Sequence, residues 1–126
     1  KEEELKELSI LFLVINNLDI FRKNIELISE VIFSNDIMNE FKQKVIDYLL
    51  SEKFFDRKKL KQEDFDQKFK DTISLINTNA PVKVIYKNKS EPEIILMFNE
   101  IIGEIKKIGL KKKIEFLEDK VSLIEQ

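Results

Sequence analysis

Carboxylate side chains are the groups of this sequence whose spacing could do chemistry. Glu63, Asp64 and Asp66 lie close together, and Glu118 is followed directly by Asp119. Grouped carboxylates can bind a hard cation such as Ca²⁺ or Mg²⁺. Neither group, however, combines acidic residues at alternate positions of a loop with a turning glycine. We therefore interpret both groups as solvated helix faces and expect no metal site.

Cysteine and histidine, which most zinc sites and many nucleophile–base pairs need, are missing from the sequence. The 126 residues contain no Cys and no His, which excludes the usual zinc sites and any nucleophile that histidine activates. Ser9 and Ser74 lie in apolar helical stretches without such a base, and no glycine-rich loop could hold a phosphate. We expect that the chain is not an enzyme and that it binds no cofactor.

Two basic runs could attract an acidic partner. The run 57–59 is followed at once by acidic residues, so we interpret it as a solvated turn and expect no direct binding of nucleic acid. The run 111–113 lies beside apolar residues and could steer an acidic partner, or could equally be a solvated turn. In the charged segment 53–62, the expected apolar anchors and helix cap are Phe54, Phe55, Leu60 and Asp56.

The segment from Pro92 to Gln126 has the clearest hydrophobic pattern. One apolar stripe with steps of four and three ends at Ile108, and a second begins out of phase at Leu110. The simplest interpretation is a helical hairpin that turns at Gly109, because glycine tolerates the positive φ that ends a helix. One long bent helix is the alternative, since a glycine inside a helix costs only about 1 kcal/mol. The stripes consist of Ile94, Phe98, Ile101, Ile105 and Ile108, and of Leu110, Ile114, Leu117, Val121 and Ile124.

Phe116 and Leu123 lie seven residues apart and outside the second stripe. A two-helix hairpin cannot cover them, and exposed apolar groups on a charged helix often mark a partner surface. Packing back onto the rest of the chain is the alternative. Gly109 is the expected hinge, at which the final helix could swap between two molecules to form a dimer. The predicted partner surface consists of Leu110, Lys112, Phe116, Lys120 and Leu123.

Several helices are predicted before this segment. The stretch Glu2–Ile15 is apolar on nearly all sides, as a buried central helix would be. Amphipathic helices are expected from the N-cap Ser34 to about Glu52 and from Glu63 to Ile76. Residues 82–89 fit a short helix or an extended loop better than a strand, which would have no partner. The capping box Ser90–Glu93 then opens the long helix.

The composition agrees with a helical protein. Apolar residues make up 43% and charged residues 37%, and two Gly and two Pro leave few tight turns for a sheet. We predict an all-α fold, with a helical bundle over residues 1–90 and a long helix with a C-terminal helical hairpin over 91–126. The expected core includes Leu8, Phe12, Ile15, Phe41, Val45 and Phe69.

The longest apolar run of the sequence has the features of neither a membrane span nor a signal peptide. The longest apolar run, Ile10 to Ile15, is too short to span a membrane, and it follows acidic residues rather than a positive region. The absence of Cys fits the cytoplasm but also fits many secreted proteins. The sequence begins at Lys1 rather than at Met, so we expect a segment of a longer protein.

Three stretches of the sequence form an ordered pattern along the chain. The first is ELSILFLVINNLDIF, a buried helix that ends in Asn and leads to a short second helix. The second is EVIFSNDIMNEFKQKVIDYL, an apolar connector followed by a helix, and the third is the closing stretch IGLKKKIEFLEDKVSLIEQ. Together, these stretches resemble the C-terminal, helicase-binding domain of DnaG-type bacterial DNA primase, and the resemblance covers nearly the whole chain. The family often has Trp in its later helices, and this chain has none.

The resemblance implies a helical bundle with a terminal hairpin and a role in DNA replication in the cytoplasm. Its implied partner is the N-terminal domains of the hexameric DnaB-type replicative helicase, onto which the domain docks primase. The catalytic parts of a primase would lie upstream of this fragment. Two alternatives stay open: the N-terminal domain of the helicase itself, which has a similar fold but is disfavoured by a terminal hairpin, and a self-associating coiled-coil module.

Overall fold

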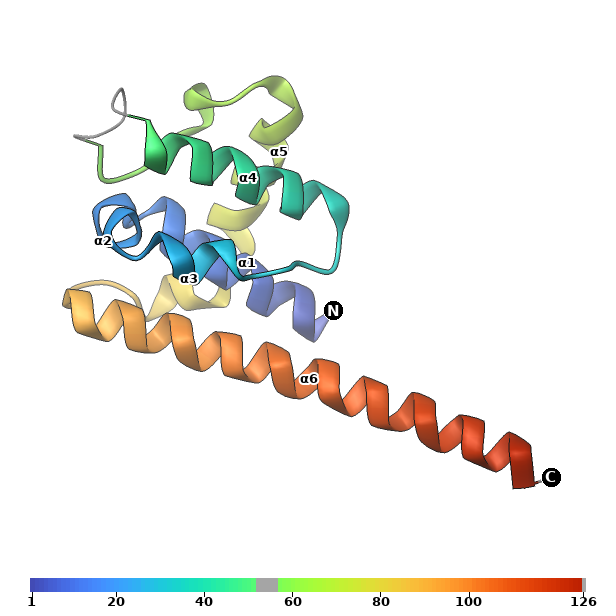
Figure 1. Ribbon diagram of the computed structural model, residues 1–126. Helices are drawn as coiled ribbons and strands as arrows, with labels where there is room; N and C mark the ends of the chain where they lie inside the picture. Colours follow the sequence, from blue (N-terminus) through green and yellow to red (C-terminus); the bar gives the residue numbers. More distant parts are fainter. Residues whose placement is uncertain (52–56, 126) are drawn as a thin grey trace.

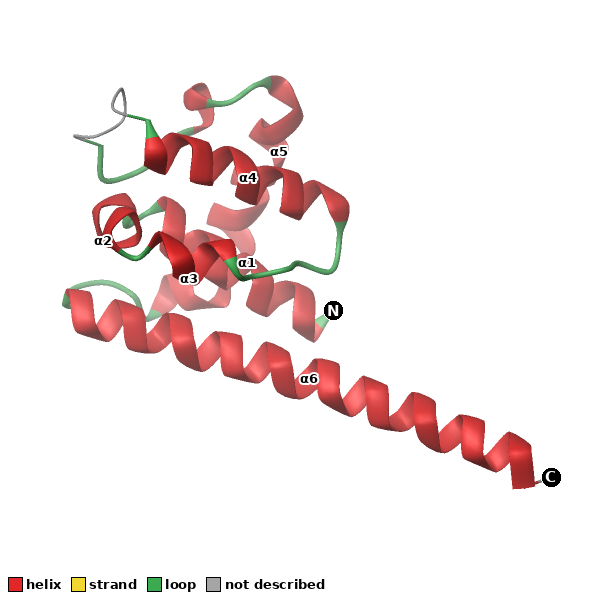
Figure 2. Cartoon of the chain, viewed as in Figure 1, coloured by secondary structure: helices red, strands yellow, loops and turns green. Residues whose placement is uncertain are grey.

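The computed structural model describes residues 1–51 and 57–125, and Phe54, Phe55 and Asp56 therefore lie outside the described residues. Within the described ranges the chain is helical and contains no strand, which confirms the all-α class (Figures 1 and 2). The elements are α1 Glu2–Ile15, α2 Leu18–Lys23, α3 Ile25–Ser29, α4 Asp36–Leu50, the short 3₁₀ turn η2 Gln62–Asp64, α5 Gln67–Asn79, the 3₁₀ turn η3 Pro81–Val84 and α6 Glu91–Glu125.

Helix α1 is the centre of the bundle. Every residue from Glu7 to Ile15 is buried, as predicted for a helix that is apolar on nearly all sides. The first half of α6, η3 and α5 all pack against it, and Figure 1 shows α6 crossing beneath it. The core cluster therefore includes Ile94 and Phe98, although the predicted division of the chain places both in the segment 91–126, outside the bundle. The six core residues predicted from the sequence are all buried: Leu8, Phe12, Ile15, Phe41, Val45 and Phe69.

A buried carboxylate of α1 binds the connection between α3 and α4. The buried carboxylate of Glu7 accepts hydrogen bonds from the Ser34 backbone N–H at 2.7 Å and from the Ser34 hydroxyl at 2.6 Å. Because Ser34 is used in this way, the N-cap of α4 is Asn35, whose side chain accepts the Met38 N–H at 2.9 Å. The prediction of Ser34 as the cap was therefore wrong by one residue.

Helix α5 begins at Gln67 rather than at Glu63. The reason is Phe65, which has an extended backbone and is buried against the rings of Phe41 and Tyr48, each at a centroid distance of 5.0 Å. A continuous helix from Glu63 would lose this placement. The hydroxyl of Tyr48 donates to the Asp64 carbonyl, and burial, reinforced by nearby carboxylates, raises the pKa of Tyr48.

Helix α6 differs from the predicted hairpin. It runs without a break through Gly109 to Glu125, and neither glycine has a positive φ. Helix-favouring residues surround Gly109, and no Pro or Asn follows it to stop the helix, so propagation outweighs the small cost of one glycine. The predicted hairpin was therefore wrong: Gly109 lies inside the helix and not at a turn, and the alternative of one long helix describes the structure.

Candidate protein-interaction site

The C-terminal half of α6 extends beyond the bundle. Figure 1 shows the helix leaving the other elements and continuing to the chain end on its own. Every residue from Gly109 to Ile124 is exposed. Its seven large apolar side chains are exposed by 47% at Ile114 to 84% at Ile124. An apolar surface of this extent on a projecting helix is typical of a binding site for another protein.

Two apolar faces run along this half of the helix. Phe116 and Leu123 follow Phe98 and Ile105 by about five turns each, so they continue the face that packs on the bundle. We call this continuation, Lys112, Phe116 and Leu123, the bundle-side face. At about 100° per residue, the second stripe lies on nearly the opposite side of the helix. We call that stripe, Leu110, Ile114, Leu117, Val121 and Ile124, the heptad stripe.

The structure divides the predicted partner surface between these faces. Phe116 and Leu123 share the bundle-side face and are 57% and 71% exposed, whereas Leu110 belongs to the heptad stripe. Lys120 follows Phe116 by one turn, and its Nζ lies 4.8 Å from the centroid of the Phe116 ring. This contact keeps a positive charge beside the most prominent aromatic group of the face.

Lys112 joins the exposed half of α6 to the bundle. Its Nζ lies 3.3 Å from Oε1 of Glu3 on α1. Two turns earlier, Lys6 of α1 forms an ion pair with Glu104 of α6. These pairs follow the edge of the contact between α1 and α6. The Lys112 side chain is 64% exposed, so solvent screens its pair with Glu3 and the pair contributes little energy. Lys112 is thus a rim residue of the bundle-side face.

An apolar groove that the sequence did not predict adjoins this face. It lies between the end of α3 and α6, where Ile102 and Ile105 meet Val31 and Ile32. Ile32 is 83% exposed. Ile105 lies about two turns before Lys112 on the same side of α6, so groove and face are continuous along the helix. The sequence signal was the apolar run before Ser34, which was interpreted only as a connector.

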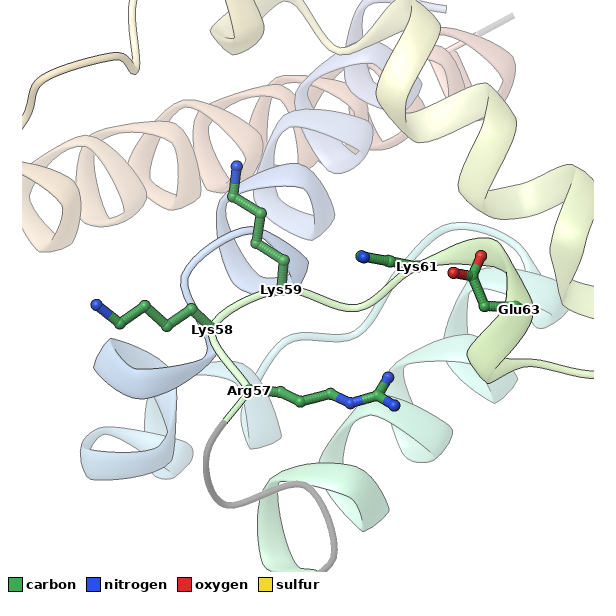
Figure 3. A pocket seen from close by; sticks show the side chains of 5 residues that line it. All are labelled: Arg57, Lys58, Lys59, Lys61 and Glu63. Atoms are coloured by element: carbon green, nitrogen blue, oxygen red, sulfur yellow. The ribbon is translucent and has the colours of Figure 1, made fainter.

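The first carboxylate group and the basic run 57–59 lie in a separate region around η2, whereas Glu118 and Asp119 lie on the exposed half of α6. Arg57, Lys58, Lys59, Lys61 and Glu63 line a shallow hollow in the loop before η2 (Figure 3). Arg57 forms an ion pair with Asp64, whose other oxygen accepts the Lys61 N–H at 2.8 Å.

The predicted anchor Leu60 is buried in this loop, and its N–H donates to the Ile15 carbonyl at 2.9 Å. The loop is thus attached to the end of α1, and Asp64 serves as a cap for the 3₁₀ turn η2.

Among the described residues, no three metal-ligating side chains come together. None of the described helices has the length and apolar character needed to cross a membrane.

Comparison of the chain with models of protein families, with curated protein sequences and with solved structures finds no match. A functional hypothesis therefore depends on two sources. One is the surface of the projecting half of α6, and the other is the resemblance of the three sequence stretches to the primase domain.

Proposed function

We propose that this chain is a protein-interaction domain that docks a DnaG-type primase onto the N-terminal domains of a DnaB-type replicative helicase during priming. The resemblance supplies the identity of the partner. The observation that carries the proposal is the exposed bundle-side face of α6, where an aromatic and an aliphatic side chain project next to lysines. The proposal assigns no catalytic step to the fragment.

The bundle-side face has the chemistry of a helical docking element. Phe116 and Leu123 lie seven residues apart and would act as the two anchors of a helix that binds an apolar groove or pairs with a partner helix. Aromatic side chains often dominate the energy of such contacts. Lys112 and Lys120 flank the anchors and would favour a partner surface that carries carboxylates.

The helix is also preorganised for binding. It is already formed in the unbound chain and is fixed to the bundle by the burial of Ile94 and Phe98. A partner would therefore not have to order this segment, which lowers the entropic cost of association. A partner helix that lies along the bundle-side face could also reach the groove at Ile32 and Ile105.

The helicase domain itself remains the competing assignment. The terminal hairpin was the feature that favoured primase, and α6 is one continuous helix instead. The two assignments predict opposite partners, because a helicase domain would bind the C-terminal domain of primase. Both candidate partners from the same organism should therefore be titrated.

Isothermal titration calorimetry of the fragment against the isolated helicase N-terminal domains tests the proposal. The double variant Phe116→Ser/Leu123→Ser should bind at least about tenfold more weakly, the equivalent of about 1.4 kcal/mol. The matched control is Leu117→Ser/Ile124→Ser, which has the same chemistry and spacing on the heptad stripe. Circular dichroism should show that both variants keep the helical bundle.

Three results would overturn the proposal. Unchanged affinity of the Phe116→Ser/Leu123→Ser variant would move the interface away from the bundle-side face. An equal loss in both double variants would indicate a general effect of polarity on α6. Binding to the primase domain, without binding to the helicase domains, would assign the chain to the helicase.

A further inference from the structure

We infer that the heptad stripe pairs two copies of this chain as a short, parallel, two-stranded coiled coil. The helix is unbroken along the whole stripe, and every residue of the stripe is exposed by about half or more. The hairpin interpretation had paired this stripe with the preceding helix. Because the helix does not turn back, that pairing does not form, and the stripe has no packing partner in the described chain.

The residue types of the stripe select a two-stranded coil. Ile114 and Val121 occupy a positions of the heptad, and Leu110, Leu117 and Ile124 occupy d positions. β-Branched residues at a combined with Leu at d favour two parallel strands over three or four, and two of the three d residues are Leu. Ile124, at the end of the stripe, departs from this pattern. Lys107 stands at the preceding a position, so the apolar seam begins at Leu110.

The charges beside the stripe favour a parallel arrangement. In a parallel pair, a g residue faces the e residue of the following heptad on the partner helix, and here Lys113 at g would face Glu118 at e. Lys106 would face Lys111, a like-charge pair, but it lies at the start of the apolar seam, whereas the Lys113–Glu118 pair lies at its centre. In an antiparallel pair, g residues face g residues. All three g positions, 106, 113 and 120, are lysines, so the antiparallel arrangement would place like charges together.

The position of the bundle permits the pairing. The side of α6 that packs on α1 lies nearly opposite the heptad stripe, so two parallel helices would carry their bundles on the outer sides of the pair. Phe116 and Leu123 lie on the outer side as well and stay accessible. Dimer formation and binding at the bundle-side face are therefore separate events, and this inference does not depend on the helicase proposal.

The stripe is short, which sets the expected strength of the dimer. It spans about two heptads, whereas stable coiled coils usually sustain the pattern over three or four. We therefore expect a reversible equilibrium between monomer and dimer that sedimentation equilibrium can follow from micromolar to millimolar concentrations. The dimer fraction should rise with concentration in the parent chain.

Paired variants test the surface and the orientation. Leu117→Ser/Ile124→Ser should leave a monomer at every concentration, whereas the matched control Phe116→Ser/Leu123→Ser should dimerise like the parent. Lys113→Glu should weaken a parallel dimer by facing Glu118, and Lys113→Glu/Glu118→Lys should restore it. In an antiparallel dimer, Lys113→Glu would face Lys120 and would strengthen association.

A single introduced cysteine gives a direct measure of orientation, because the chain has no cysteine of its own. Ile124→Cys at a d position should form a disulfide dimer readily, since parallel d residues face each other, and Ser122→Cys on the outer side should not. A parent chain that stays monomeric at millimolar concentration would overturn the inference. Dimers that persist in the Leu117→Ser/Ile124→Ser variant would overturn it as well.

Discussion

The two halves of α6 carry similar apolar stripes and have different surroundings. In the first half, Ile94 and Phe98 are buried against the bundle, and the ring centroids of Phe98 and Phe21 are 5.1 Å apart. In the second half, Phe116 continues the same face but is 57% exposed, because the bundle has ended. A spacing of three and four residues thus determines that a helix forms and which side is apolar. Whether the apolar side is buried depends on how far the other helices extend along α6.

The comparison is tested most strongly by truncating one phenylalanine in each half. Phe98→Ala should reduce the free energy of unfolding by about 3–5 kcal/mol, because it removes a buried ring and leaves a cavity. Phe116→Ala, the same change about five turns later on the same face, should cost under about 0.5 kcal/mol. Urea denaturation of both variants measures the difference. Similar losses would show that the second half of α6 is packed in solution.

The positions that sequence reasoning placed well are those whose structure is decided locally. The range of α1 and the capping box at Ser90 follow from hydrophobic pattern and side-chain spacing, and both are present in the structure. Phe65 and Ser34 were misplaced because distant partners decide them: an aromatic cluster for one and Glu7 for the other. Neither partner can be located from sequence periodicity.

The candidate site shows the same division. The sequence identified Phe116 and Leu123 as surplus apolar residues, and the structure leaves both exposed. It did not identify the heptad stripe as an unpaired surface, because a glycine was interpreted as a turn. Whether a helix continues through Gly109 depends on a balance of about 1 kcal/mol between glycine and its helix-favouring neighbours, and spacing alone does not measure this balance.

The two glycines of α6 give a second test, with a smaller expected effect. Gly103 lies in the packed half and Gly109 in the projecting half, and an added Cβ would meet no atom within 4 Å at either position. Each change to Ala should therefore add up to about 1 kcal/mol of helix propensity. Gly103→Ala should raise the free energy of global unfolding, since its half unfolds with the bundle.

Gly109→Ala should instead act locally. It should leave global unfolding unchanged and slow amide hydrogen exchange over residues 110–124 by about fivefold, the equivalent of about 1 kcal/mol. Urea denaturation and hydrogen exchange on both variants separate these effects. If both substitutions raised the global free energy equally, the two halves of α6 would form one cooperative unit, and the contrast between them would be wrong.

The start of α6 is capped by a charged side chain, whereas its last turn has no charge that balances the helix dipole. A change of pH tests the stabilisation at the start of the helix and should have the smallest effect. At the packed end, the Glu93 carboxylate accepts the Ser90 N–H at 3.0 Å and the Ser90 hydroxyl at 2.9 Å. The backbone hydrogen bond chiefly, then the hydroxyl and the charge of Lys89, lower the pKa of Glu93. The last turn at the projecting end contains no basic residue to balance the helix dipole.

A carboxyl group whose pKa is lower in the folded state stabilises the fold above its unfolded pKa, and this contribution is lost as the pH falls through the folded pKa. Glu93→Gln keeps the acceptor of the capping box but removes the charge. The parent should therefore have a slightly higher melting temperature than Glu93→Gln at neutral pH. The two should converge as the solution is acidified below the usual range of a glutamate. A difference between parent and Glu93→Gln that stays constant down to acidic pH would mean that the charge of Glu93 does not stabilise the start of α6.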